Sequence, residues 1–310
     1  MIQSFLTIGQ LVLVLFLIIG TGFFLGKKNF ITDAGNKTLS NVVMYVVVPC
    51  MLITSFQREF DIEDLKKFAI CFGLSVGIHL FSIGISFLVV RDKDKYKEKV
   101  FRFVVIFCNC GFMAYPLEQA LFGNSGIFFG SAFVSAFYLF AWTIGIYMVS
   151  GDKSKLSLKK AVLNPGVMGV IIALLLYVLK ISLPEILYTP MSYLAALNTP
   201  VPMLIIGYQL SKADIKGVFK EKKLWLTAAL RLVVIPLIVL GLCFILKLDS
   251  MISIIIIIAA STPPATIISL FCAMLDKESS LSSSLVSVET LMSVVTMPVI
   301  IGLTNAIMNG

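Results

Sequence analysis

Hydrophobic residues run along the chain in ten long stretches, and short polar segments separate them. Most stretches reach the roughly 20 residues that an α-helix needs to cross a bilayer. Backbone groups in lipid must pair within the protein, and a stretch such as SIIIIIAA lacks the alternation of a barrel strand. The pattern predicts an all-α polytopic membrane protein with ten transmembrane helices. The predicted spans are residues 5–26, 36–57, 67–90, 102–121, 126–149, 162–180, 185–210, 223–246, 251–275 and 281–306.

The ten spans divide into two sets of five, so the second set enters the membrane from the opposite side, as in an inverted repeat. Prolines occupy similar places in the two halves. Pro49 of span two matches Pro202 of span seven. Pro116 of span four matches Pro264 of span nine. We therefore predict two inverted five-helix repeats, residues 1–155 and residues 156–310.

Composition and charge placement agree with a membrane protein. The chain is 58% hydrophobic and only 14% charged, whereas soluble domains are about a quarter charged. Of its 25 Lys and Arg residues, 19 lie in the loops after the odd-numbered spans and 5 in the alternate loops. This bias predicts that the odd loops are cytoplasmic and that both termini are extracytoplasmic. The net charge of +8 is then a topology signal that suits anionic lipid headgroups, and no nucleic-acid partner is expected.

The sequence offers little support for a cofactor, a metal or an enzyme. Its six cysteines all fall in hydrophobic spans, outside any CxxC or CxxH pattern, so neither a metal site nor a disulfide framework is expected. With one histidine, a His-rich metal cluster is excluded. Walker and dinucleotide glycine patterns are missing, which argues against ATP as the energy source. We expect transport on solute or ion gradients, with H⁺ or Na⁺ as the candidate coupling ion.

Span four contains the sequence CNCGFMAYPLEQA, which brings a proline, an acid and polar residues into a hydrophobic segment. A proline removes one helical hydrogen bond, and lipid tolerates that only where protein or water accepts the freed groups. Broken helices place half-helix ends inside the membrane: the N-terminal ends suit a carboxylate, and the C-terminal carbonyls suit a cation or proton donor. The alternative is a proline kink without a binding site. The candidate substrate-binding residues are Asn109, Gly111, Tyr115, Pro116, Ser261, Thr262, Pro263, Pro264, Asn41 and Asn198. For the two residues in spans two and seven, Asn41 and Asn198, polar contacts between helices are the alternative.

Four ionisable residues inside predicted spans are candidates for ion or proton coupling. Glu118 either binds the coupling ion or is a carboxylate at the membrane interface. Glu289 and Arg231 lie about 12 Å deep and could form an ion pair; alternatively, Arg231 binds the substrate carboxylate or extends to the inner surface. His79 is either a proton relay or a structural residue with a hydrogen bond to a neighbouring helix.

Several motifs together resemble the auxin efflux carrier family of membrane permeases, bacterial type. They are NCGFMAYPLEQALFGNSG, NPGVMGVIIALLL, LNTPVPMLIIGYQL, STPPATIISLFCAMLDKE and VETLMSVVTMPVI, and they cover essentially the whole chain. The resemblance implies broken helices four and nine that cross near Pro116 and Pro263-Pro264. It also implies a scaffold of spans one, two, six and seven, a transport domain of spans three to five and eight to ten, and a homodimer.

These observations predict a secondary active transporter, a permease for small organic anions, and carboxylates above all, in the cytoplasmic membrane. Alternating access would take place at the crossing of spans four and nine. Three rivals stay open: a receptor or sensor with a transporter fold, a channel, and an intramembrane enzyme. The enzyme would need a nucleophile beside His79, for which the sequence has no recognisable motif.

Overall fold

The computed structural model describes residues 2–152, 154, 157–275 and 280–309. Within these residues every regular element is helical, apart from one isolated bridge between Cys108 and Pro264. Six helical segments are long and apolar enough to cross a membrane, which agrees with an all-helical, multi-pass membrane protein. The count of ten spans and the inverted repeat stay predictions. The six segments are Ile8–Lys27, Asp33–Ser55, Ile62–Val89, Asn124–Ser150, Lys222–Ile245 and Ser280–Met308.

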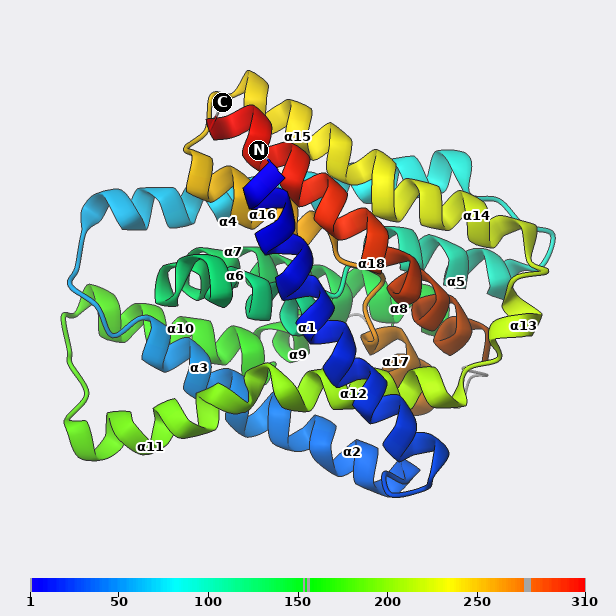
Figure 1. The fold of residues 1–310 in the computed structure, drawn as a ribbon, viewed down its shortest axis with the longest axis horizontal. Coiled ribbons are helices and arrows are strands. Elements are labelled where there is room, and N and C mark those ends of the chain that lie inside the picture. The colour runs from blue at the N-terminus through cyan, green and yellow to red at the C-terminus, as the bar shows by residue number, and fades with distance from the viewer. Residues whose placement is uncertain (1, 153, 155–156, 276–279, 310) are drawn as a thin grey trace.

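Helices follow one another along the chain with short connections (Figure 1). The first half contains α1 (Ile2–Lys27), α2 (Asp33–Val42), α3 (Val48–Ser55), α4 (Ile62–Val89), α5 (Lys95–Ile106), α6 (Tyr115–Phe122), α7 (Asn124–Phe140) and α8 (Ile146–Ser150). The second half contains α9 (Leu158–Val162), α10 (Pro165–Val178), α11 (Glu185–Ala195), α12 (Pro200–Lys212), α13 (Ile215–Val218), α14 (Lys222–Ala229), α15 (Ile235–Ile245), α16 (Ser250–Ser261), α17 (Ile267–Met274) and α18 (Ser280–Asn309). Four π-helical turns lie within or beside these helices, at Val43–Val47, Cys110–Ala114, Ala141–Gly145 and Leu230–Val234.

Side-chain caps fix where several helices begin. Asp94 accepts a hydrogen bond from the Tyr96 N–H group at the start of α5. Asn164 accepts one from the Gly166 N–H group at the start of α10, and Asp249 caps α16 in the same way. Each cap satisfies an N–H group that has no acceptor inside its own helix. Short Asp and Asn side chains in the loops therefore set the helix boundaries.

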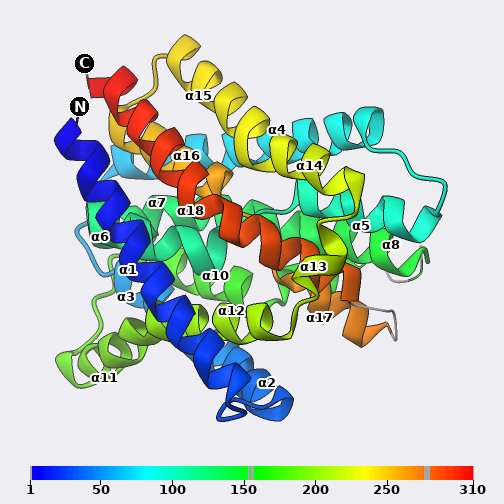
Figure 2. The same cartoon turned by 45° about the vertical axis from the view of Figure 1, so that its right-hand side comes forward.

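The most extensive helix contact joins α1 to α12, and α1 passes across α12 in both ribbon views (Figure 2). Glycines allow the two backbones to approach closely. A Cβ atom added to Gly207 of α12 would lie 2.1 Å from the carbonyl oxygen of Ile19. One added to Gly22 of α1 would lie 2.4 Å from the carbonyl oxygen of Leu204. Small residues at such a contact provide the van der Waals packing that holds membrane helices together.

The helices pack in two groups. In the first group, α12 contacts both α1 and α2, and α3 contacts both α10 and α11. In the second group, α4 packs along α7, α16 packs between α15 and α18, and α14 packs on α5. Contacts of α1 with α18 and of α10 with α7 join the groups. The division into a scaffold and a transport domain, and the relative motion of the two, stay predictions.

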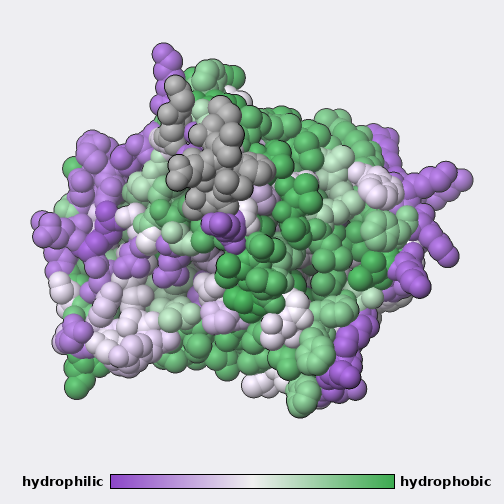
Figure 3. Space-filling view, viewed as in Figure 1, coloured by the Kyte–Doolittle hydropathy of each residue, from purple (hydrophilic) through white to green (hydrophobic). Residues whose placement is uncertain are grey.

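Loops that the charge pattern assigns to one side of the membrane contact one another. The Leu183 N–H group donates to Gln57 Oε1 at 2.7 Å, which joins the loop after α3 to the loop after α10. On the opposite side, Lys97 Nζ lies 2.6 Å from Glu221 Oε1, near the starts of α5 and α14. Hydrophobic residues dominate the middle of the molecular face, and hydrophilic residues gather toward its left and right ends (Figure 3). The arrangement agrees with a bilayer between two polar ends.

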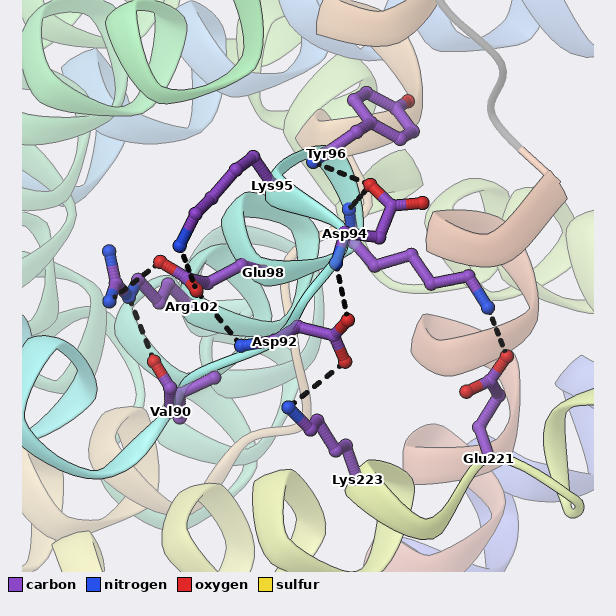
Figure 4. A network of polar contacts seen from close by, with 10 residues as sticks. Val90, Asp92, Asp94, Lys95, Tyr96, Glu98, Arg102, Glu221 and Lys223 are labelled. Carbon is purple, nitrogen blue, oxygen red and sulfur yellow. Dashed lines mark hydrogen bonds and ion pairs between the residues drawn. The ribbon is translucent and has the colours of Figure 1, made fainter.

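A network of charged residues links the start of α5 to the start of α14 (Figure 4). Lys223 Nζ lies 2.9 Å from Asp92 Oδ2, and the Asp92 N–H group donates to Glu98 Oε2 at 2.8 Å. The hydrogen bond from Lys223 holds the pKa of Asp92 below its ordinary 3.8. The hydrogen bond that Lys97 donates to Glu221 raises the pKa of Lys97. Both contacts lie within the second packed group and fasten two of its helices together.

Replacement of Asp92 by asparagine should lower the melting temperature in detergent slightly at neutral pH, because a solvent-screened pair contributes about 0.2–1 kcal/mol. A lowered pKa in the folded state means that the stabilisation is present above 3.8 and is lost as the pH falls through the lowered value. The difference from wild type should therefore disappear well below pH 3.8. Glu59→Gln, at an exposed carboxylate outside the network, is the control. A difference that persists in acid would show that the Asp92 charge is not responsible.

Candidate functional site

The first break in a membrane segment lies between α5 and α6. Helix α5 ends at Ile106, residues 107–109 leave the helical conformation, and the π-helical turn that leads into α6 begins at Cys110. The prediction that the chain breaks near Pro116 is therefore wrong in position. Pro116 lies in the first turn of α6, directly after the π-helical turn Cys110–Ala114, and the chain stays helical through it. The break falls instead at the CNC sequence that precedes it.

The second break lies between α16 and α17 and contains Pro263 and Pro264, as predicted. The two breaks pair through main-chain hydrogen bonds, like two short antiparallel strands. The Asn109 N–H group donates to the Pro263 carbonyl oxygen at 2.7 Å, and the Ala265 N–H group donates to the Phe107 carbonyl oxygen at 2.8 Å. The pairing satisfies backbone groups that the breaks would otherwise leave exposed to lipid. Four helix ends thus meet at one place.

The helix ends at this crossing carry partial charges of both signs. The segments that start at Cys110 and at Ile267 present N–H groups that have no acceptor in their own first turn, with a partial positive charge. Helices α5 and α16 end here with carbonyl groups, and buried Arg231 donates to two of them, those of Val105 and Ala260. The crossing therefore combines two positive helix ends with two negative ends that already hold a cation.

A cavity of about 920 Å³ lies beside the crossing. Helices α2 and α12 form one wall, and the crossing forms the opposite wall together with α7, α17 and the start of α18. Four charged side chains line it, Asp33, Lys37, Lys212 and Asp214. All four lie in or next to loops that the charge pattern assigns to the cytoplasm. The cavity is thus bounded by α2 and α12, by α7, α17 and α18, and by both breaks.

Asn109 is the best-placed polar residue of this wall. It lines the cavity and is 5% exposed. Its main-chain groups are used in the crossing, since its N–H donates to Pro263 and its carbonyl accepts from the Met113 N–H group at 3.0 Å. Its side-chain Nδ2 atom, in contrast, is buried without a hydrogen-bond partner. A buried donor without an acceptor costs about 1–3 kcal/mol, so a rotation of this side chain toward an acceptor in the cavity would be favourable.

Two more of the predicted substrate-binding residues, Gly111 and Asn41, line the cavity. A Cβ atom on Gly111 would meet nothing closer than the Tyr138 hydroxyl at 3.8 Å. Asn41 is exposed on the α2 wall, on the side opposite the crossing. These residues come from different packed groups, so a ligand between them would touch both.

The other predicted substrate-binding residues lie outside the cavity lining. The hydroxyl groups of Ser261 and Thr262 donate to carbonyl groups of their own helix, those of Ile257 and Ala259, at 2.6 and 2.8 Å. The side chains of Tyr115 and Asn198 are fully buried, and neither the Tyr115 hydroxyl nor the Asn198 amide has a partner in the described structure. The three remaining residues are prolines: Pro116 lies in α6, and Pro263 and Pro264 lie in the second break.

The four predicted coupling residues are all buried, and none of them lines the cavity. Glu118 is 1% exposed, and its Oε2 atom has no partner. It packs against α7 so closely that a Cβ atom on Gly130 would lie 2.0 Å from Oε2. The interface alternative for Glu118 is therefore wrong, since the carboxyl group is enclosed by protein.

His79 lies in an aromatic cluster. Its Nδ1 atom donates to the Ser75 carbonyl oxygen at 2.8 Å, within α4 and not to a neighbouring helix. Its ring stacks on Phe140 with the ring centroids 5.3 Å apart. Phe133 and Phe137 complete the cluster, and the second ring nitrogen, Nε2, has no partner. The surroundings favour a packing role.

The expected ion pair between Glu289 and Arg231 is not formed. Glu289 Oε1 instead accepts a hydrogen bond from the Thr227 hydroxyl at 2.8 Å. Thr227 lies one helical turn before Arg231, so acid and base face the same side at different heights. Among the described residues no carboxylate lies within 4.0 Å of the guanidinium. Arg231 also does not extend to the surface, because it is 1% exposed.

Much of the polar lining was missed at the level of the sequence. One group comes from α2, where Asp33, Asn36, Lys37 and Ser40 follow the spacing of one helical face. Another comes from the start of α18, where Ser280, Ser283 and Ser284 lie in a serine-rich run. Both patterns are visible in the sequence, but polar residues at the end of a span normally indicate no more than the edge of the membrane.

Comparison with known proteins agrees with this architecture. A family described as membrane transport protein matches residues 7–158 and 152–301. The chain is similar to an uncharacterized transporter of Methanothermobacter thermautotrophicus, with 22% identity over 294 residues, 93% of this chain and 96% of the relative. It is also similar to the uncharacterized transporter MJ1031 of Methanocaldococcus jannaschii, with 25% identity over 225 residues, 68% of this chain and 71% of the relative. The family match covers both halves of the chain, so this protein belongs to the membrane transport protein family, the auxin efflux carrier family that its motifs resemble.

Proposed function

We propose that this protein is a secondary active transporter of small organic anions, carboxylates above all. One observation carries the proposal: Asn109 lines the cavity next to the crossing of two broken helices, and its buried side-chain Nδ2 atom has no hydrogen-bond partner. An amide N–H donates well to a carboxylate oxygen, and a hydrogen bond to a charged group contributes about 1.5–3 kcal/mol. The donor thus favours an acceptor ligand over a hydrophobic one.

The surroundings of Asn109 support a negative charge at this place. The helical segments that begin at Cys110 and Ile267 direct their N-terminal ends toward the crossing, and Gly111 lets a ligand approach the main chain. Helix N-termini bind anions through free N–H groups and the helix dipole. Lys37 and Lys212 in the lining are balanced in charge by Asp33 and Asp214, so the preference for an anion rests on the helix ends and on Asn109.

The proposed mechanism is alternating access between the two packed groups. The proposal includes ten spans in two inverted repeats, residues 1–155 and 156–310, with a scaffold of spans one, two, six and seven. The cavity has walls from both groups, so a relative shift would change its access. On the predicted outer side, Arg58 Nη1 donates to Ser125 Oγ at 3.1 Å, and the Tyr177 hydroxyl donates to the Asp61 carbonyl oxygen at 3.1 Å. These contacts join the loop after α3 to α7 and α10, and in this proposal they restrict access from that side.

The proposed setting is the cytoplasmic membrane, with both termini extracytoplasmic and a homodimer formed through the scaffold. The charge bias of the loops and the family membership support it. H⁺ or Na⁺ is the candidate coupling ion. Glu118 is the candidate proton site, because its enclosed carboxyl group has an unpartnered oxygen.

Uptake into proteoliposomes tests the proposal. Purified protein would be reconstituted and supplied with labelled mono- and dicarboxylates under imposed pH, Na⁺ and voltage gradients. Saturable uptake of one carboxylate, competed by its unlabelled form, is the expected result. Binding without flux would indicate a receptor, and currents far faster than a carrier cycle would indicate a channel; either result would overturn the proposal.

Replacement of Glu118 by glutamine should flatten the dependence of uptake on the pH gradient, because the amide keeps the shape of the carboxyl group but carries no titratable proton. The measurement is the initial uptake rate across a series of imposed pH and Na⁺ gradients. Glu63→Gln, at an exposed carboxylate near the start of α4, is the matched control. A Glu118→Gln profile identical to wild type would remove Glu118 as the coupling group.

A further inference from the structure

Arg231 is among the largest fully buried side chains of the protein. It lies in the π-helical turn Leu230–Val234, between α14 and α15. Its Nη1 atom lies 3.3 Å from the Val105 carbonyl oxygen, and its Nη2 atom donates to the Ala260 carbonyl oxygen. It does not line the cavity. The guanidinium therefore lies behind the crossing, away from the proposed substrate.

The two acceptors are carbonyl groups in the last turns of two helices that end at the crossing. Val105 is the residue before the end of α5, and Ala260 is the residue before the end of α16. Carbonyl groups in a last turn have no N–H partner in their own helix. Each helix C-terminus carries about −0.5 elementary charge, so the two ends together present about −1. One guanidinium offsets that charge.

Carbonyl groups at the ends of broken helices are the groups that coordinate a coupling cation in secondary transporters. In this protein the same kind of acceptor pair is occupied by a side chain. Arg231 has no carboxylate partner within reach, because the nearest buried acid, Glu289, accepts from Thr227. The carbonyl groups are thus the hydrogen-bond partners that hold the charge in a dry environment.

We propose that the Arg231 guanidinium is a built-in cation, which takes the position of a coupling ion at the carbonyl ends of α5 and α16 and makes the carrier independent of Na⁺. The cation would stay with the crossing throughout the transport cycle. The flux part of this inference rests on the proposed function. The ion-site part does not, because it concerns the stability of the crossing itself.

Thermal melting of the full-length protein in detergent tests the ion site without any substrate. The salts are choline chloride, sodium chloride and guanidinium chloride at matched, low millimolar concentration. Wild type should melt at the same temperature in all three. Arg231→Ala leaves room for a small cation, so it should melt lower than wild type in choline and regain part of the difference in guanidinium. Melting of Arg231→Ala like wild type in choline, or a specific stabilisation of wild type by Na⁺, would overturn the proposal.

Two further comparisons separate charge from packing. Arg231→Lys keeps a cation, whereas Arg231→Met keeps an unbranched chain without one, so the lysine variant should melt well above the methionine variant. Equal melting of the two would contradict the proposal, and the comparison holds even if Arg231→Ala cannot be purified. Arg102→Ala is the matched control, because Arg102 also donates to a carbonyl group, that of Val90, but has Glu98 as an ionic partner. Guanidinium should not rescue it.

The transport experiment uses the carboxylate that the proteoliposome assay identifies as a substrate. Wild-type uptake should have the same rate in Na⁺ and in choline, and Arg231→Ala should be slower by about tenfold or more, with partial recovery in guanidinium. A Na⁺ requirement of wild-type uptake would overturn the inference while leaving the proposed function intact. Lack of uptake for every carboxylate would overturn the proposed function, and the melting experiment would still decide the role of Arg231.

Discussion

Replacing Asn109 with alanine is expected to bring saturable uptake of the organic anion close to background, while the protein still folds and inserts. The substitution removes the unpartnered Nδ2 donor at the cavity wall. A hydrogen bond to a charged ligand contributes about 1.5–3 kcal/mol, which corresponds to a roughly 10- to 100-fold weaker affinity. The crossing should survive, because Asn109 holds it through main-chain groups that alanine also has. The measurement is initial uptake against substrate concentration.

Folding of the Asn109→Ala protein would be checked by its elution as a single species and by its melting temperature. The melting temperature should not fall, since the lost amide has no hydrogen-bond partner in the unliganded protein. Asn124→Ala, at an exposed residue at the start of α7, serves as the control and should transport like wild type. Wild-type transport by Asn109→Ala would remove this residue from the site and with it the main support for the proposed function.

Replacing Gly207 with alanine should have the largest effect on stability. The added Cβ atom would lie 2.1 Å from the Ile19 carbonyl oxygen and 2.7 Å from the Phe23 nitrogen, so α1 and α12 must separate. Both contacts are with backbone atoms, which cannot turn aside like a flexible side chain. Overpacking of this kind typically costs about 1–3 kcal/mol. The expected result is a clear loss of folded protein on heating in detergent.

Gly20→Ala is a matched control for this substitution, because a Cβ atom on Gly20 of α1 would meet nothing within 4 Å. It should melt at or above the wild-type temperature, since alanine is the better helix former. Equal stability of Gly207→Ala and Gly20→Ala would show that the close backbone contact between α1 and α12 does not exist in solution. The transport assay is not needed for this comparison.

The helical, multi-pass architecture could be predicted because hydrophobic length and internal hydrogen bonding leave few alternatives in lipid. The second break could be predicted for a similar reason, since Pro263 and Pro264 both lack an N–H group. The position of the first break could not. Pro116 is tolerated in the first turn of α6, and the chain opens instead around Asn109, where pairing with the second break compensates the lost helical bonds. That compensation comes from a partner more than 150 residues away along the chain.

The candidate site shows the same limit. Asn109, Gly111 and Asn41 line the cavity and were all predicted from polar character near a break or a matching proline. Ser261 and Thr262 have the same character, but their hydroxyl groups bond back to their own helix. The hydrogen-bond partners of Arg231 and Glu289 could not be predicted from the sequence either. Depth in the membrane brings the two charges near each other, yet carbonyl groups and a threonine hydroxyl are nearer still.

The crossing is held by peptide groups, with Asn109 bonded to Pro263 and Ala265 bonded to Phe107 through the main chain alone. Every amino acid except proline supplies the same peptide groups, so point mutations around the pocket can alter its shape and polarity without breaking these hydrogen bonds. Substitution of single side chains of α2 and α18 would then change which substrate the cavity prefers. A fold of this kind allows related carriers to differ in substrate while they keep the same crossing.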